Sequence, residues 1–237
     1  MKVHNKSKNK KLLIIGGSSS LGKDIIDKFI SKNWCVIATY NFNKLHPHKN
    51  LTTKKLNLLS HKSLDSFKKY LRKNTAIDYV LFLPSILNGK KLEDYSLSNV
   101  NDCMNVNFNS QAYLLGQILL SLSKKCSILF ISSISGEKGS FDPIYAASKG
   151  AQISFVKSIS KSLAPNLRVN VLSPSLIKDS SMYFQMDKSI RRKHLLSNPM
   201  KSLVDKADIA EIVYDLSKNH WKHLNGQVIS VNGGIYS

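Results

Sequence analysis

The sequence predicts a single-domain α/β protein, built on a doubly wound parallel sheet with helices on both faces. Three observations predict this fold. Short apolar runs alternate along the chain with longer segments whose apolar residues recur at three- and four-residue spacings. Several of these runs are continuously apolar, which is typical of strands buried on both sides. The 237 residues contain no linker rich in glycine, serine or proline, so one large core is expected.

The alternation gives the elements in order, because strands separated by helices form βαβ units. The predicted strands are Lys11–Ile15, Cys35–Thr39, Lys54–Leu56, Ile77–Leu83, Cys126–Ile131, Arg168–Leu172 and Gln227–Val231. The predicted helices are Leu21–Ser31, His61–Leu71, Val100–Leu122, Ala146–Leu163 and Lys206–Leu216. Residues 1–10 form a basic N-terminal extension, and residues 11–237 form the domain.

The segment Ser173–Asp205 breaks this alternation and contains two prolines, an apolar cluster and a basic cluster. The apolar cluster consists of Met182, Tyr183, Phe184 and Met186, and the basic cluster of Lys188, Arg191, Arg192, Lys193 and His194. A long irregular insertion in a compact domain is either a functional lid or a loosely ordered loop. The basic cluster is typical of a solvated helix face; alternatively, it attracts a phosphate, a carboxylate or a carrier-bound substrate.

The net charge of +20 is spread along the chain instead of being concentrated in one tract. Diffuse charge favours a lysine-rich solvated surface over a specific nucleic-acid partner. No apolar run approaches the ~20 residues that cross a bilayer. No signal peptide is recognisable, so a cytoplasmic protein without a membrane partner is predicted. The three cysteines are scattered, which favours free thiols over a disulfide or a metal site.

The first predicted strand leads through a glycine- and serine-rich turn directly into a helix. Gly16 permits a tight turn, and Gly22 allows the helix to pack close to the sheet. The free N–H groups and the dipole at a helix N-terminus favour an anion. Such runs also occur in plain loops, but the position at the head of a βαβ series favours a dinucleotide pyrophosphate. The predicted cofactor contacts in this turn are Gly16, Ser18, Ser19, Ser20, Leu21 and Gly22.

The end of the second strand indicates which dinucleotide binds. An acidic residue there accepts a hydrogen bond from the ribose 2′-hydroxyl of NAD, but the stretch Tyr40–Lys44 contains none. Without a carboxylate, a 2′-phosphate meets no repulsion, and Asn41 or Lys44 can contact it. NADP is therefore favoured over NAD, although no arginine is present to clamp the phosphate.

Tyr145 and Lys149 are four residues apart in a predicted helix and so share one face. A free phenol has a pKa of ~10, and a nearby ammonium lowers it. The pair can therefore exchange a proton with a carbonyl or alcohol oxygen. Ser133 follows an apolar strand, where its hydroxyl can hold that oxygen; Ser132 takes this place if the turn is shifted. Tyr-x-x-x-Lys also occurs on ordinary helix surfaces, but the glycine-rich turn and the strand-ending serine favour the catalytic interpretation.

With these motifs, the chain resembles the short-chain dehydrogenase/reductase family. The similarity covers nearly the whole chain, from Leu12 to Gly234. It implies a Rossmann-like seven-stranded sheet and an NAD(P)-dependent oxidoreductase. The residues that carry the resemblance are, in chain order, Gly16, Gly22, Asn107, Ser133, Tyr145, Lys149, the run Arg168–Pro174 and the closing run Asn225–Gly234.

The resemblance also implies a role for each site residue. Tyr145 would be the acid/base, and Lys149 would bind the nicotinamide ribose and tune the tyrosine. Ser133 would orient the carbonyl, and Asn107 would hold a proton-relay water. Ser173–Asp205 would be the substrate lid. Further cofactor contacts are expected at Tyr40, Asn41, Asn57, Leu58, Pro174 and Ile177.

Two departures from the family pattern affect the cofactor pocket. Ser20 replaces the middle glycine of the phosphate turn, and Phe82-Leu83-Pro84-Ser85 replaces an Asn-Asn-Ala-Gly motif. The replaced asparagines would support the sheet and the adenosine pocket, and Pro84 lacks a backbone donor. We therefore expect weaker cofactor affinity, whereas all four residues of the proton-transfer site are present.

The sequence leaves three functional hypotheses. The favoured one is a carbonyl reductase or alcohol dehydrogenase acting on a small or medium metabolite. The second is a non-catalytic dinucleotide-binding regulator, and the third, which rests only on the charge, is a nucleic-acid-binding protein. For the favoured hypothesis, the resemblance implies a homodimer or homotetramer assembled through the helices Val100–Leu122 and Ala146–Leu163.

Overall fold

The computed structural model describes residues 9–73 and 76–236, so residues 1–8 of the predicted basic extension lie outside the described part. Within it, seven parallel strands form one sheet in the order β3-β2-β1-β4-β5-β6-β7, which confirms the predicted doubly wound fold. The strands are β1 (Lys11–Ile15), β2 (Cys35–Tyr40), β3 (Leu51–Lys55), β4 (Ile77–Phe82), β5 (Leu122–Ile131), β6 (Arg168–Pro174) and β7 (Val228–Val231). The strand order reverses between β1 and β4, where sheets of this kind bind ligands at the carboxyl ends of the strands.

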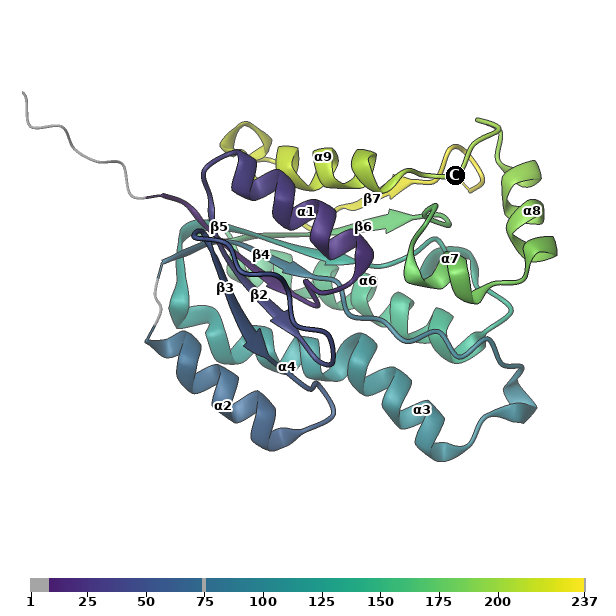
Figure 1. Ribbon diagram of the computed structural model, residues 1–237, viewed down its shortest axis with the longest axis horizontal. Helices are drawn as coiled ribbons and strands as arrows, with labels where there is room; N and C mark the ends of the chain where they lie inside the picture. Colours follow the sequence, from purple (N-terminus) through teal and green to yellow (C-terminus); the bar gives the residue numbers. More distant parts are fainter. Residues whose placement is uncertain (1–8, 74–75, 237) are drawn as a thin grey trace, which may run out of the picture.

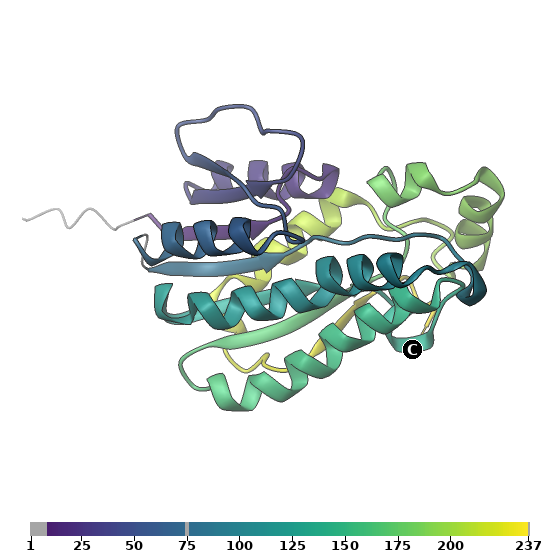
Figure 2. The ribbon, with the colours of Figure 1, turned by 90° about the horizontal axis from the view of Figure 1, so that it is seen from below.

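Helices cover both faces of the sheet (Figures 1 and 2). On one face, α1 (Ser20–Ser31) and α9 (Lys206–Leu216) lie side by side. The other face is covered by α2 (His61–Arg72), α4 (Ser110–Ile118) and α6 (Pro143–Leu163). Each of these helices therefore protects strand residues of one face from water.

Each face has its own apolar core, because successive strand residues point to opposite sides. In β1, Leu13 and Ile15 pack into the core under α2, α4 and α6. Leu12 and Ile14 pack into the core under α1 and α9. All four side chains are fully buried, and each burial stabilises the fold by roughly 1.5–3 kcal/mol. The strand that leads into the phosphate turn is thus rigidly held.

The predicted helix Val100–Leu122 is wrong in its bounds. The chain forms α3 (Leu97–Met104), a π-helical turn over Asn105–Asn109 and then α4, which ends at Ile118. Leucines continue the apolar pattern beyond α4, but Leu120 is 94% exposed within a 3-10 turn, and β5 begins at Leu122. An apolar pattern does not reveal a π turn, because apolar residues continue on both sides of it.

The segment Ser173–Asp205 is less irregular than the sequence predicts. It contains α7 (Ser181–Gln185) and α8 (Lys188–Ser197). The Ser180 side chain accepts a hydrogen bond from Tyr183 N and so begins α7. Both helices lie at the end of the sheet toward which the strands point (Figure 1). This places the segment over the expected ligand crevice.

The described residues also bear on a membrane span, a metal site and the state of the cysteines. Within residues 9–73 and 76–236, no helix combines the length and the apolar character that a membrane span requires. Among the same residues, no three His, Cys, Asp or Glu side chains gather as a possible metal site. Cys35, Cys103 and Cys126 are free thiols, of which the last two are buried.

Candidate active site

The start of α6 positions Tyr145 and Lys149. Asp142 caps the helix by accepting a hydrogen bond from Tyr145 N at 2.9 Å, and Pro143 occupies the first helical position. The two side chains lie one helical turn apart and are 6% and 1% exposed, respectively. The Asp-Pro pair therefore fixes where the helix begins and holds the tyrosine in its first turn.

Serine hydroxyls and the side chain of Met182 lie near the Tyr145 phenol. Its oxygen lies 3.8 Å from Met182 Sδ, which belongs to α7. Burial raises the pKa of Tyr145 to about 12, and hydrogen bonding by the hydroxyls of Ser133 and Ser85 opposes part of this rise. The sequence predicts a lowered pKa instead. The difference arises because burial has the largest effect on this phenol, and it favours the neutral form.

Lys149 is held by two oxygen acceptors. Its Nζ donates to Ile131 O at 2.8 Å and makes a longer hydrogen bond of 3.5 Å to Gln152 Oε1. Burial lowers the pKa of Lys149 to about 7, because the ammonium loses its hydration. The amine therefore changes its charge within the physiological range.

Asn107 lies in the π turn between α3 and α4, and π turns are frequent at functional sites. Its side chain accepts from Ile86 N at 2.6 Å and donates to Ile86 O and Ser148 Oγ, both at 2.9 Å. Its backbone carbonyl accepts from Gln152 Nε2 at 2.8 Å. Asn107 thus joins the segment after β4 to α6, and its suggested hold on a relay water stays a prediction.

The two candidate serines after β5 face different partners. Ser132 Oγ donates to Lys149 O at 3.0 Å and is 4% exposed, so it fastens the strand end to α6. Ser133 Oγ accepts a hydrogen bond from Ser135 N at 3.1 Å, and the same hydroxyl acts to lower the pKa of the Tyr145 phenol. The structure therefore brings Ser133, rather than Ser132, to the tyrosine.

Two buried glutamines complete this network, and sequence reasoning missed both. Gln111 and Gln152 are 0% exposed, and Gln152 Nε2 donates to Gln111 Oε1 at 3.1 Å. Since both N–H groups of Gln152 bind carbonyl oxygens, its Oε1 is fixed as an acceptor toward Lys149. A polar amide three residues after Lys149, on the same helix face, was the available signal.

Asp142 is a third residue that sequence reasoning missed, although an aspartate before proline is a recognised sign of a helix start. The carboxylate is 2% exposed and accepts hydrogen bonds from Tyr145 N, Asn88 N, Gly89 N and the Tyr95 hydroxyl. It therefore joins the long segment after β4 to the start of α6.

Asp142→Ala is expected to destabilise the fold by about 3–5 kcal/mol, because it removes a helix cap and leaves buried donors unpaired. Urea denaturation of the variant and the wild type measures this difference. Asp142→Asn keeps one acceptor oxygen and should lose less. A loss below about 1 kcal/mol for the alanine variant would contradict this role.

The predicted phosphate turn follows β1 as a tight turn that leads into α1. A Cβ on Gly22 would lie 2.5 Å from Gly17 O, so only glycine allows α1 to approach the turn. Gly16 has a φ of 80°. Ser19 Oγ donates to Gly16 O and accepts from Gly22 N, so this side chain shapes the turn. Gly22 N and Lys23 N are hydrogen-bonded to Ser19, and an anion at the start of α1 would be met by the positive end of the helix dipole, so the residues present fit a pyrophosphate.

The remaining predicted cofactor residues lie around the carboxyl ends of the strands. Ser20 Oγ donates to Asp179 O at 3.4 Å, which joins the phosphate turn to the lid segment. Asn57 Oδ1 accepts from Leu59 N and so closes its own turn. The other positions are Ser18, Tyr40 and Asn41, which are half-buried, and Leu21, Leu58, Pro174 and Ile177, which are buried.

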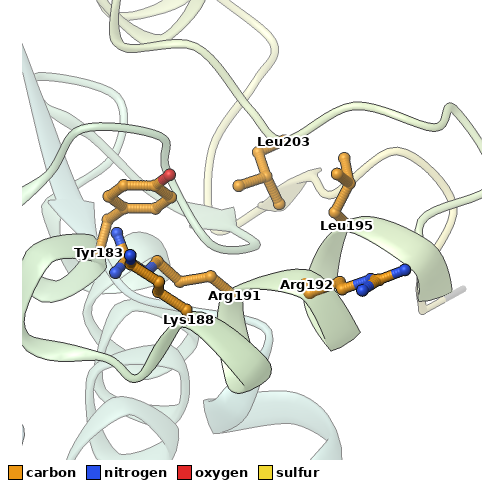
Figure 3. A pocket seen from close by; sticks show the side chains of 6 residues that line it. All are labelled: Tyr183, Lys188, Arg191, Arg192, Leu195 and Leu203. Atoms are coloured by element: carbon orange, nitrogen blue, oxygen red, sulfur yellow. The ribbon is translucent and has the colours of Figure 1, made fainter.

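The segment Ser173–Asp205, which the sequence predicts to be a lid, contains a hollow of about 310 Å³ (Figure 3). Its walls combine cationic and apolar side chains from α7, α8 and the segment after α8. The Arg191 guanidinium stacks 4.6 Å from the Tyr183 ring centre, and its Nε is buried without a hydrogen-bond partner in the described structure. The lining residues are Tyr183, Lys188, Arg191, Arg192, Leu195 and Leu203.

Comparison with protein families and curated proteins gives consistent relatives. A family model described as enoyl-(acyl carrier protein) reductase matches residues 16–236. Two proteins named 3-oxoacyl-[acyl-carrier-protein] reductase FabG, from Buchnera aphidicola subspecies Baizongia pistaciae and Schizaphis graminum, are 29% and 30% identical to this chain. Each alignment covers 98% of this chain and 99% of the relative. An oxidoreductase of Bacillus subtilis, YmfI, is 27% identical over 95% of this chain and 98% of its own.

Solved structures share the fold over almost the whole chain. A short-chain dehydrogenase family protein of Francisella tularensis superposes with a TM-score of 0.89 at 22% identity, covering 96% of this chain and 99% of that chain. A short-chain dehydrogenase/reductase of Brucella melitensis gives a TM-score of 0.89 at 24% identity, covering 97% and 98%.

Proposed function

Since the chain belongs to the short-chain dehydrogenase/reductase family and is an NAD(P)-dependent oxidoreductase, we propose that it reduces the 3-oxo group of an acyl thioester, with Tyr145 as proton donor. The observation that carries the proposal is the arrangement around Tyr145. The phenol is buried, the hydroxyl of the strand-end Ser133 acts on it, and the buried Lys149 Nζ lies 5.8 Å from the ring centre.

The chain's own residues supply binding and proton transfer. Ser133 orients the carbonyl oxygen, and Tyr145 gives its proton to that oxygen as the carbonyl becomes an alkoxide. With a pKa raised to about 12, the phenol is protonated at neutral pH and ready to donate. The Lys149 ammonium balances the charge of the phenolate that remains. The Gly16–Gly22 turn would hold the pyrophosphate of a dinucleotide, which when bound would supply the hydride.

The lid supports an acyl substrate that carries an anionic arm. Lys188, Arg191 and Arg192 surround the lid hollow with positive charge, and Leu195 and Leu203 give it apolar walls. Phosphate esters on a substrate arm bind to such cations through charge-assisted hydrogen bonds. Several relatives are named for reducing a 3-oxoacyl group on an acyl carrier protein, which agrees with this chemistry.

The proposal includes NADPH as the preferred cofactor. The stretch that follows β2 contains no carboxylate, and Lys44 is exposed there. We expect NADPH to bind at least about tenfold more tightly than NADH in a fluorescence titration. The loaded protein should then reduce a 3-oxoacyl pantetheine thioester. Dinucleotide binding without turnover of any carbonyl would favour the non-catalytic regulator instead.

The same proposal covers assembly and location. Tyr113 of α4 is 45% exposed, and Leu120, just beyond this helix, is 94% exposed. Such exposure in an isolated chain is typical of side chains that pack against a second subunit. A homodimer or homotetramer in the cytoplasm is the corresponding expectation, and light scattering in solution measures the subunit number.

A further inference from the structure

Ser85 has a buried hydroxyl with no hydrogen-bond partner in the described structure. It follows β4, at the point where the strand order reverses. Buried hydroxyl groups are nearly always paired, so each exception calls for an explanation. A ligand that binds against the Ser85 side chain would provide the missing partner.

The neighbours of Ser85 hold it in place from both sides. Before it, Pro84 O accepts from Gln111 Nε2 at 2.9 Å. After it, Ile86 N donates to Asn107 Oδ1 at 2.6 Å, and Ile86 O accepts from Asn107 Nδ2 at 2.9 Å. Gln111 and Asn107 are both 0% exposed. Two rigid amide side chains therefore fix the backbone on each side of the Ser85 hydroxyl.

The Pro84 ring supports the same placement. A Cβ on Gly16 would lie 3.0 Å from Pro84 Cγ, so the ring packs directly against the phosphate turn. The segment that departs from the family motif is thus anchored to the cofactor side of the site as well as to α4.

The Ser85 hydroxyl lies near the Tyr145 phenol. The hydroxyls of Ser133 and Ser85 both act to lower the pKa of Tyr145, against the larger effect of burial. Ser133 Oγ already accepts from Ser135 N, whereas Ser85 Oγ has no partner at normal hydrogen-bond geometry among the described residues. A carbonyl oxygen placed to receive the Tyr145 proton would therefore meet hydroxyl groups from two different strand ends.

We propose that Ser85 is a further catalytic residue, which donates a hydrogen bond to the substrate carbonyl oxygen together with Ser133. This inference rests on the proposed reduction. As hydride adds to the carbonyl carbon, the π electrons of the C=O bond move to oxygen, and Tyr145 then protonates that oxygen. Ser85 keeps its own proton and stabilises the negative charge while it develops.

The test compares Ser85→Ala and Ser85→Thr with the wild type, using NADPH and a 3-oxoacyl pantetheine thioester. Ser85→Ala should lower kcat/KM by about 100-fold, whereas Ser85→Thr keeps the hydroxyl and should stay within about tenfold of the wild type. The melting temperature of Ser85→Ala should not fall, because the lost hydroxyl makes no hydrogen bond within residues 9–73 and 76–236. Its affinity for NADPH should also be unchanged.

The matched control is Ser217→Ala, a buried serine at the end of α9 whose hydroxyl bonds to Tyr214 O. It should retain wild-type activity. Full activity of Ser85→Ala beside an active wild type would overturn the inference, and so would a fall in its melting temperature that parallels the loss of activity. An inactive wild type would instead overturn the proposed reduction itself.

Discussion

Tyr145→Phe is expected to lower the rate of carbonyl reduction by about 100- to 10,000-fold, the usual contribution of a positioned general acid. The phenylalanine ring fills the same space but has no proton to give. Since the ring stays buried and the contact of the phenol oxygen with Met182 Sδ is long, at 3.8 Å, stability should change little. Steady-state kinetics and thermal denaturation of the same preparation measure both effects.

Tyr113→Phe is the matched control, because this tyrosine is 45% exposed on α4 and outside the site. It should keep wild-type activity. If Tyr145→Phe remained as active as this control, a different group would have to be the proton donor.

Lys149→Met is expected to reduce kcat/KM by about 100- to 1,000-fold, because it removes the positive charge beside the developing phenolate. Methionine has a similar length and no charge, so the helix and its packing are retained. The variant should also bind NADPH more weakly, if the amine holds the nicotinamide ribose as proposed. Unchanged turnover would remove Lys149 from the mechanism.

The burial of Lys149 also predicts a pH dependence of stability. Its pKa is about 7 in the folded chain and 10.5 in its ordinary state, so the unfolded chain binds more protons between these values. Wild-type stability therefore gains from this residue as the pH rises through that window. Lys149→Met lacks the gain, so its stability relative to the wild type should be highest below pH 7 and should fall toward pH 10.

Much of the site could be predicted because its signals are local. The spacing of Tyr145 and Lys149 and the glycines at 16 and 22 indicate their geometry without knowledge of distant contacts. The roles of Gln152 and Asp142 depend instead on contacts with residues that are distant in sequence. Their partners are separated from them by tens of residues in sequence, so their roles become visible only after the chain has folded.

The departure at Phe82–Ser85 shows why a motif alone was insufficient. The sequence indicates what the replaced asparagines would have contributed, but it does not indicate what compensates for them. In the structure, Gln111 binds Pro84 O, and the Pro84 ring packs against Gly16. A motif comparison counts lost contacts, whereas these new contacts depend on residues from two other elements.

For the pKa of the Tyr145 phenol, the sequence predicts a lowered value, whereas the structure gives a raised one. Helical spacing brings the Lys149 amine near the ring, but the spacing contains no information about burial. The ammonium itself is desolvated, and Nζ donates to Ile131 O. Burial therefore dominates, and it raises the pKa of Tyr145 to about 12.

The most direct test of the central claim is a single turnover with NADPH deuterated at the transferring carbon of the nicotinamide. The purified wild type is mixed with this cofactor and a 3-oxoacyl pantetheine thioester, and the product is analysed by mass spectrometry. The proposal predicts a 3-hydroxyacyl thioester with one deuterium on its hydroxyl-bearing carbon, and no such product from Tyr145→Phe on the same timescale. A loaded wild-type protein that leaves the thioester unreduced, or a Tyr145→Phe variant that labels it equally fast, would contradict the proposal.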